Sequence, residues 1–185
     1  MKSCEGMGAR AINLGGFKDI QPPPACSQAI SSFIAENPGV PIDVLCITPP
    51  ADTTLPIFSQ PCRSNVLCCI EISREPFLRP DGILALRITF VVNVPLHLVV
   101  SGNGTVICEF DTFIKLFEQD IICPQNETNF QCRITQILCH AVFMNETQIV
   151  VDVSICKEIV IISPEACPPV GQFPPQCRTI FPPMT

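Results

Sequence analysis

The chain has 185 residues, of which 47% are hydrophobic, and its 11 basic and 17 acidic residues give a net charge of −6. This length predicts one domain with a sizeable core. The negative charge and the lack of a basic cluster argue against nucleic-acid binding, because a phosphate backbone would be repelled. No apolar run approaches the roughly 18 residues of a membrane-spanning helix, so we expect no membrane insertion.

Proline divides the chain into three zones. Residues 1–62 contain nine prolines and residues 164–185 contain seven, on either side of a proline-poor middle. Proline-rich segments are stiff and extended. We therefore predict a Pro/Cys-rich N-terminal arm over 1–62, a β-sandwich core over 63–163 and a Pro/Cys-rich C-terminal tail over 164–185.

The first predicted element is a short helix inside the N-terminal arm. The segment QAISSFIAE, residues 28–36, has apolar residues at helical spacing. Ser27 is the expected N-terminal cap, and Asn37 with Pro38 is expected to end the helix.

The stretch SNVLCCIEIS, residues 64–73, reads as a strand with two adjacent cysteines. Successive side chains of a strand point to opposite faces. We therefore expect Cys68 to face the core and Cys69 to face solvent, a packed arm or another subunit.

The strongest pattern runs from Leu84 to Val100, where every even-numbered residue is apolar. This period of two is typical of a half-buried strand. Pro95 cannot donate to a sheet ladder, so a bend, bulge or edge position is expected between Asn93 and Pro95. Residues 149–155, IVVDVSI, alternate in the same way.

Turn signals separate these runs. Asp-Gly within RPDG, residues 79–82, and Asn-Gly within SGNG, residues 101–104, predict hairpins, and residues 124–129 and 144–147 predict looser turns. Together, these runs and turns predict at least five consecutive antiparallel strands. The predicted fold class is all-β, an antiparallel β-sandwich of meander or jelly-roll type.

Thirteen cysteines are an odd number, so at least one stays free or bonds to another molecule. Each disulfide contributes about 2–4 kcal/mol, which a core of this size does not need for folding. We therefore expect the sulfur to provide durability or to join chains. A cysteine on an arm either reaches its own body or bonds to a neighbour. The candidates for intermolecular disulfides are Cys4, Cys26, Cys69, Cys167 and Cys177.

Motifs for metal binding and catalysis are missing from the sequence. There is no CxxC pair and there are only two histidines, so no metal site and no cofactor are predicted. Cys139 and His140 adjoin in sequence and would face opposite ways in a strand, while Glu118 and Asp120 are attributed to chance. We predict no catalytic residue and no enzymatic activity. The alternative is a cytosolic metal-binding or redox-sensing protein.

Three Asn-x-Thr matches begin at Asn103, Asn126 and Asn145. All three fall in predicted turns, where asparagine is common for its own reasons. Glycosylation would require a secretory route, and the first residues contain no apolar run that a signal peptide needs. A secreted glycoprotein with its leader removed is a third alternative.

The segment VSICKEIVIISPEACPPVGQFPPQC, residues 153–177, together with cysteines along a β-rich body, resembles the cysteine-rich endospore surface proteins of spore-forming Firmicutes. These are spore coat, exosporium and spore appendage subunits, and the likeness covers roughly residues 62–177. The resemblance implies synthesis in the mother cell without a signal peptide, self-assembly and disulfide cross-linking on the spore surface. The expected protein is thus a structural homo-polymer, a filament or a lattice, with other spore-surface proteins as further partners.

Overall fold

The computed structural model describes residues 12–51, 53–58, 62–78, 80, 82, 84–122 and 130–161. This part of the chain contains one helix and eight strands. In chain order they are β1 (Ile12–Ile20), α1 (Pro24–Glu36), β2 (Ile42–Ile47), β3 (Thr53–Phe58), β4 (Cys68–Leu78), β5 (Leu84–Gly102), β6 (Thr105–Ile122), β7 (Phe130–Asn145) and β8 (Gln148–Ile161).

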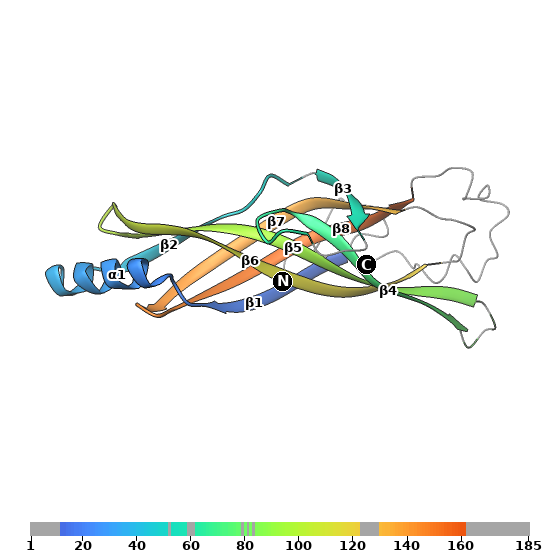
Figure 1. The fold of residues 1–185 in the computed structure, drawn as a ribbon, viewed down its shortest axis with the longest axis horizontal. Coiled ribbons are helices and arrows are strands. Elements are labelled where there is room, and N and C mark those ends of the chain that lie inside the picture. Colours follow the sequence, from blue (N-terminus) through green and yellow to red (C-terminus); the bar gives the residue numbers. More distant parts are fainter. Residues whose placement is uncertain are drawn as a thin grey trace.

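The strands form two packed layers, which confirms the all-β antiparallel sandwich (Figure 1). One layer has the order β1-β8-β7, and in the other β5 lies between β6 on one side and β2 and β4 on the other. Strand β3 pairs with β7 and, through two residues, in parallel with β4. The consecutive strands β4, β5 and β6 form a meander, so neighbours in the sequence are neighbours in this sheet.

The core lies between the layers and follows the predicted alternation. On β5 the even-numbered side chains from Ile88 to Val100 are at most 2% exposed. On β8 the odd-numbered side chains from Ile149 to Ile155 are fully buried. Both predicted apolar faces are therefore confirmed, because β-branched and other apolar side chains on one face of a strand gain free energy when they leave water.

Pro95 lies where β5 changes partners. On one side of β5, the pairing with β4 ends at Asn93 and the pairing with β2 begins at His97. Pro95 therefore has no ladder partner on that side within the described strands, and on the other side it lies opposite Phe113 of β6. The local edge position expected from its missing N–H is confirmed. The bulge of this hairpin lies elsewhere, between Val100 and Ser101.

The extended arm predicted over residues 1–62 is wrong for residues 12–58. Strand β1 pairs with β8 along its whole length, and β2 pairs with β5 inside the sandwich. Pro38, Pro41 and Pro49 lie in the connections between these elements, where proline is well tolerated. The predicted C-terminal tail, residues 164–185, lies outside the described residues.

Helix α1 begins four residues earlier than predicted and ends where predicted. Pro24 occupies its first turn, a position that suits proline because the first N–H groups of a helix have no partner in it. Ser27 therefore lies inside the helix and is not its cap. At the other end, the backbone N–H and the side-chain amide of Asn37 both donate to the Phe33 carbonyl, at 2.8 and 3.0 Å.

The predicted Asn-Gly turn closes the hairpin between β5 and β6. Asn103 and Gly104 have φ values of 52° and 78°, the left-handed conformation that such a two-residue turn requires. Figure 1 shows α1 beside this turn, at one end of the sandwich. The ring of Phe33 lies so close to Gly102 that a Cβ there would be 2.4 Å from it, which explains a residue without a side chain.

Candidate functional site

Two disulfides fasten β7 to the opposite sheet. Cys46 of β2 is bonded to Cys139, and Cys69 of β4 is bonded to Cys132, with Cα–Cα distances of 5.8 and 6.3 Å. Cys132 and Cys139 are about 23 Å apart along an extended strand. We call these two bridges the disulfide seam, because they fix the two sheets at two well-separated points along one edge.

At the other edge of the sandwich, no disulfide joins β1 to β6 among the described residues. Lys18 of β1 donates a hydrogen bond to the Phe113 carbonyl of β6, at 2.5 Å, and its Nζ lies 4.0 Å from the centre of the Phe113 ring. Partial burial lowers the pKa of Lys18, and the nearby Lys115 lowers it further. This edge is therefore held by polar contacts and packing, in contrast to the seam.

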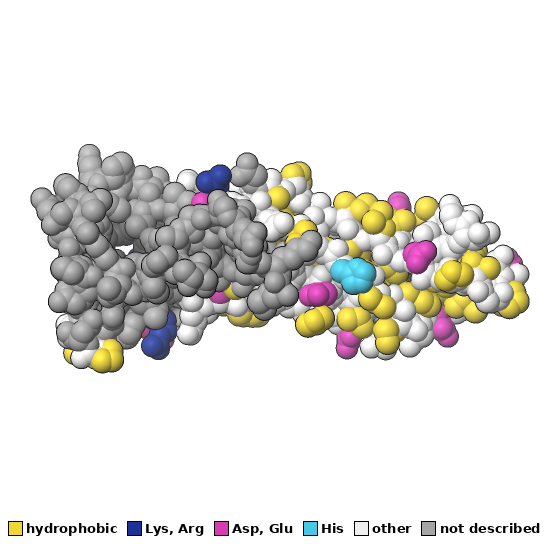
Figure 2. Space-filling view, turned by 180° about the vertical axis from the view of Figure 1, so that it is seen from behind, with side chains coloured by type: hydrophobic (Ala, Val, Ile, Leu, Met, Phe, Trp, Pro, Cys, Tyr) yellow, Lys and Arg dark blue, Asp and Glu magenta, His cyan; other side chains and the backbone are white. Residues whose placement is uncertain are grey.

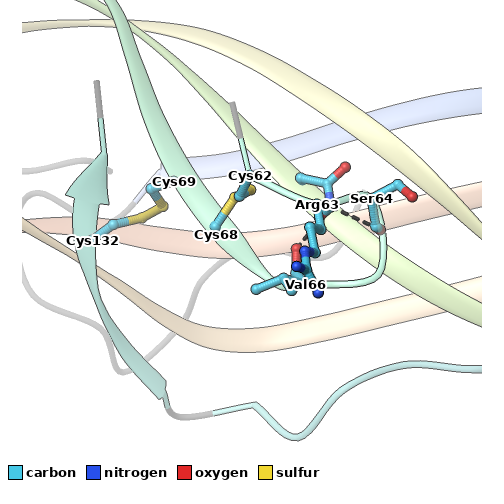
Figure 3. Close-up of a disulfide and its surroundings, with 8 residues drawn as sticks. Cys62, Arg63, Ser64, Val66, Cys68, Cys69 and Cys132 are labelled. Atoms are coloured by element: carbon cyan, nitrogen blue, oxygen red, sulfur yellow. Dashed lines mark hydrogen bonds between the residues drawn. A yellow bond between two sulfur atoms is a disulfide. The ribbon is translucent and has the colours of Figure 1, made fainter. Parts of the chain in front are cut away.

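The adjacent cysteines of β4 point to opposite faces and are both buried. Figure 3 shows their bridges leading away from the strand to different partners, Cys69 to Cys132 and Cys68 to Cys62. Cys69 lies in the main core and is 0% exposed. The predicted orientation is therefore wrong: Cys69 faces the core, and Cys68 faces the outer side, where the Cys62 bridge and neighbouring apolar side chains cover it.

Asn93 holds the loop that covers Cys68. It lies directly opposite Cys68 on β5 and is 1% exposed. Its Nδ2 donates to the carbonyl oxygens of Val66, at 2.8 Å, and Ser64, at 3.0 Å, and Arg63 O lies at 3.5 Å. These carbonyls belong to the turn shown in Figure 3. The only signal for this role in the sequence is weak, a single amide within an apolar run.

Replacing Asn93 by alanine is expected to lower the free energy of unfolding by about 2 kcal/mol, because the carbonyls of the turn lose the hydrogen bonds that the buried Asn93 amide donates. Replacement by aspartate should cost more, since a carboxylate would face the same oxygens. Urea unfolding measures both effects. In Asn93→Ala the Cys62–Cys68 bridge should also be reduced at a lower dithiothreitol concentration than in the wild type, as read by thiol alkylation and mass spectrometry. An unchanged reduction profile would contradict the role of Asn93 in covering this bridge.

A further bridge joins α1 to the sandwich. Cys26 of the helix is bonded to Cys108 of β6, with a Cα–Cα distance of 5.5 Å. Cys26 and Cys69 were candidates for bonds between molecules, and the structure assigns both to bridges within the chain instead. The physical reason is burial, since both side chains are at most 5% exposed. The other three candidates, Cys4, Cys167 and Cys177, lie outside the described residues.

Lys157 and Glu118 form a charge pair inside the sandwich. Lys157 Nζ contacts Glu118 Oε1, and the two side chains are 1% and 3% exposed. The Nζ also lies 4.2 Å from the centre of the Phe90 ring. Burial lowers the pKa of Lys157 to about 7. From the sequence alone, Glu118 was attributed to chance and Lys157 was not singled out.

Register could have revealed this pair. Lys157 continues the odd-numbered row of β8 that includes Val153 and Ile155, and Glu118 continues the even-numbered row of β6 that includes Leu116. A charged residue in phase with a buried row must be paired or neutral in the folded protein. Facing rows on two sheets bring the opposite charges together.

His97 lies on the outer face of β5 between two carboxylates. Its Nδ1 is 2.7 Å from Asp111 Oδ1, and its Nε2 is 3.5 Å from Glu109 Oε2. The hydrogen bond to Asp111 is the main cause that raises the pKa of His97, and Glu109 adds to it. Because His97 is half-buried and both carboxylates are largely exposed, solvent screening keeps the interaction weak.

The raised pKa of His97 predicts a stabilisation that depends on pH. Its contribution is fully present below the ordinary value of 6.5 and is lost as the pH rises through the folded-state pKa. Asp111→Asn should therefore lower the free energy of unfolding below pH 6 by less than about 1 kcal/mol. Thermal unfolding from pH 5 to 9 measures this difference. A difference that grows toward alkaline pH would contradict the assignment.

The described residues contain no group of three or more His, Cys, Asp or Glu side chains that could hold a metal ion. Cys139 is bonded to Cys46, and the adjacent His140 is exposed, so these neighbours do not form a Cys–His pair. No helix in the described ranges has the length and apolar character needed to cross a membrane.

No protein-family model matches the chain, and neither curated proteins nor solved structures include a significant match.

Proposed function

We propose that the protein is a non-enzymatic structural subunit that assembles with its own copies into disulfide-cross-linked polymers on a spore surface. The observation that carries the proposal is the state of the cysteines. All nine cysteines among the described residues are disulfide-bonded. Eight of them form the four bridges that fasten the helix, the covering loop and both sheets, and Cys156 is the ninth. Such a subunit is built for oxidising surroundings and resists unfolding.

Contacts between copies have candidate surfaces on both sheets. Phe17 of β1, Leu45 of β2 and Phe117 of β6 are 77%, 61% and 66% exposed. The solvent face of an antiparallel sheet is usually polar, and large apolar groups on it favour association. Figure 2 shows one side of the molecule, where hydrophobic side chains lie over the half farthest from the grey residues, with acidic side chains and no lysine or arginine among them.

The position of these groups favours an open assembly. Phe17 belongs to one sheet, and Leu45 and Phe117 belong to the other. A contact in which one sheet of a copy meets the other sheet of the next copy is head-to-tail. Repeated contacts of this kind that do not close into a ring produce a filament.

Cysteines outside the described residues would supply the bonds between copies. The chain has thirteen cysteines, an odd number, and the nine described ones are bonded. A cysteine that lacks a partner in its own chain is therefore sought among Cys4, Cys123, Cys167 and Cys177. Three of these four are intermolecular candidates named from the sequence.

Electron microscopy and gel electrophoresis, each with and without reductant, test the proposal. Polymers that survive hot detergent and collapse on reduction are expected. The variant Phe17→Ser/Phe117→Ser should polymerise less with an unchanged unfolding temperature, while Thr105→Ser serves as a conservative control on an exposed surface. A monomer under both conditions would refute the proposal. About one zinc per chain in protein purified under reducing conditions would favour the metal-binding alternative instead.

The spore location has its own test. Antibodies against the purified chain should label the surface of intact spores from the source organism and should leave vegetative cells unlabelled. Labelling confined to the cytosol of growing cells would contradict this location. The assembly proposal would still be tested separately by electron microscopy.

A further inference from the structure

The buried pair of Lys157 and Glu118 lacks the contacts that normally stabilise such a pair. Lys157 Nζ touches Glu118 Oε1, and neither this nitrogen nor either carboxylate oxygen has another hydrogen-bond partner among the described residues. A buried ion pair recovers its desolvation cost only with good geometry and further hydrogen bonds. As separate charges, the two groups are therefore poorly accommodated at this position.

The surroundings favour the uncharged forms of both groups. Phe90 is fully buried and lies against the Lys157 ammonium, so its ring occupies space that water would otherwise fill. Burial lowers the pKa of Lys157 to about 7, so a substantial fraction of the amine is neutral near neutral pH. A neutral amine is a nucleophile, and the adjacent carboxyl carbon is an electrophile.

We propose that Lys157 and Glu118 are joined by an amide bond that the folded protein forms by itself. In the pair, Nζ first gives a proton to the carboxylate, which leaves a neutral amine and a neutral carboxylic acid. Nζ then attacks Cδ of Glu118, the bond from Cδ to the hydroxyl oxygen breaks, and the hydroxyl takes a second proton from Nζ and leaves as water. The step requires no oxidant and no cofactor.

Proximity lowers the activation barrier of this condensation. The fold holds the two groups in contact, which replaces an encounter between separate molecules and corresponds to a high effective concentration. The buried site also keeps the released water from returning easily. The product has one N–H and one carbonyl group in place of two buried charges, which replaces the desolvation cost of two charges by the smaller cost of an amide.

The bond would join the two sheets where the disulfide seam does not. Glu118 is on β6 and Lys157 is on β8, whereas the seam links β2 and β4 to β7. Unlike the seam, an amide withstands reductants. The sandwich would thus stay covalently closed under conditions that open every disulfide. This inference concerns the single subunit and does not depend on the proposed assembly.

Peptide mapping of reduced and alkylated protein tests the bond. Trypsin cannot cleave after a lysine whose amine is in an amide, so residues 134–178 should remain one peptide. That peptide should be joined to residues 116–133, with a total mass lower by one water molecule than the sum of the two peptides. Fragmentation should place the link at Lys157 and Glu118.

Two variants control the assignment. Lys157→Met should release residues 116–133 as an unlinked peptide, and Lys18→Met, which removes the hydrogen bond to Phe113, should leave the linked peptide unchanged. Should a variant fail to fold, the map of the wild-type protein still decides. Separate wild-type peptides with full masses and cleavage after Lys157 would overturn the proposal.

Discussion

Replacing Cys46 and Cys139 together by alanine is expected to lower the free energy of unfolding by about 4 kcal/mol. The two residues are 93 positions apart, and closing such a loop restricts the unfolded chain strongly. The neighbouring Cys69–Cys132 bridge shortens the effective loop, which keeps the expected cost below the value for an isolated loop of that length. Urea unfolding under non-reducing conditions measures the change.

The bridge between Cys62 and Cys68 is the matched control for this prediction. Only six positions separate its cysteines, so its removal should cost about 2 kcal/mol. Loss of the Cys46–Cys139 bridge should therefore lower the free energy of unfolding more than loss of the Cys62–Cys68 bridge. Equal costs for the two double variants would show that loop closure does not determine how these disulfides stabilise the fold.

The second large effect is expected at the buried pair. Lys157→Met alone leaves Glu118 buried without a partner and should lower the free energy of unfolding by about 3–5 kcal/mol. The double variant Lys157→Met/Glu118→Leu replaces both groups by apolar side chains and should recover the part of that loss that comes from the unpaired carboxylate. The part that comes from the proposed amide cross-link should not be recovered.

Chemical unfolding of the single and double variants separates these outcomes. Exposed ion pairs contribute at most about 1 kcal/mol, so Arg133→Met, which breaks the surface pair with Glu158, serves as the comparison. A cost for Lys157→Met no greater than that of Arg133→Met would contradict the burial of an uncompensated carboxylate.

The alternating pattern predicted the sheets well because it reports burial directly. The rows of β5 and β8 lie in the core as expected, since each side chain on the apolar face loses contact with water. The Asn103–Gly104 turn was equally readable, because few residues adopt its backbone conformation. These features depend on local chemistry that a single sequence contains.

Features that depend on distant partners could not be predicted in this way. Cys69 and Cys132 are 63 positions apart, and nothing in the sequence shows which of thirteen cysteines meet. The face of β4 that contains Cys68 was predicted to lie in the core, but it is the outer face, and the loop that starts at Cys62 covers it only in three dimensions. The prolines misled for a similar reason, since Pro24 starts a helix inside the fold and does not stiffen an arm.

Disulfide mapping of mixed assemblies tests most directly whether sulfur both staples each subunit and joins subunits. Light and ¹⁵N-labelled chains are mixed while reduced, oxidised together and digested without reductant. The bridges Cys26–Cys108, Cys46–Cys139, Cys62–Cys68 and Cys69–Cys132 should each appear with both peptides of one isotope. Peptides containing Cys4, Cys123, Cys167 or Cys177 should include mixed light–heavy pairs. An absence of mixed pairs, or mixed pairs at the four named bridges, would contradict the account.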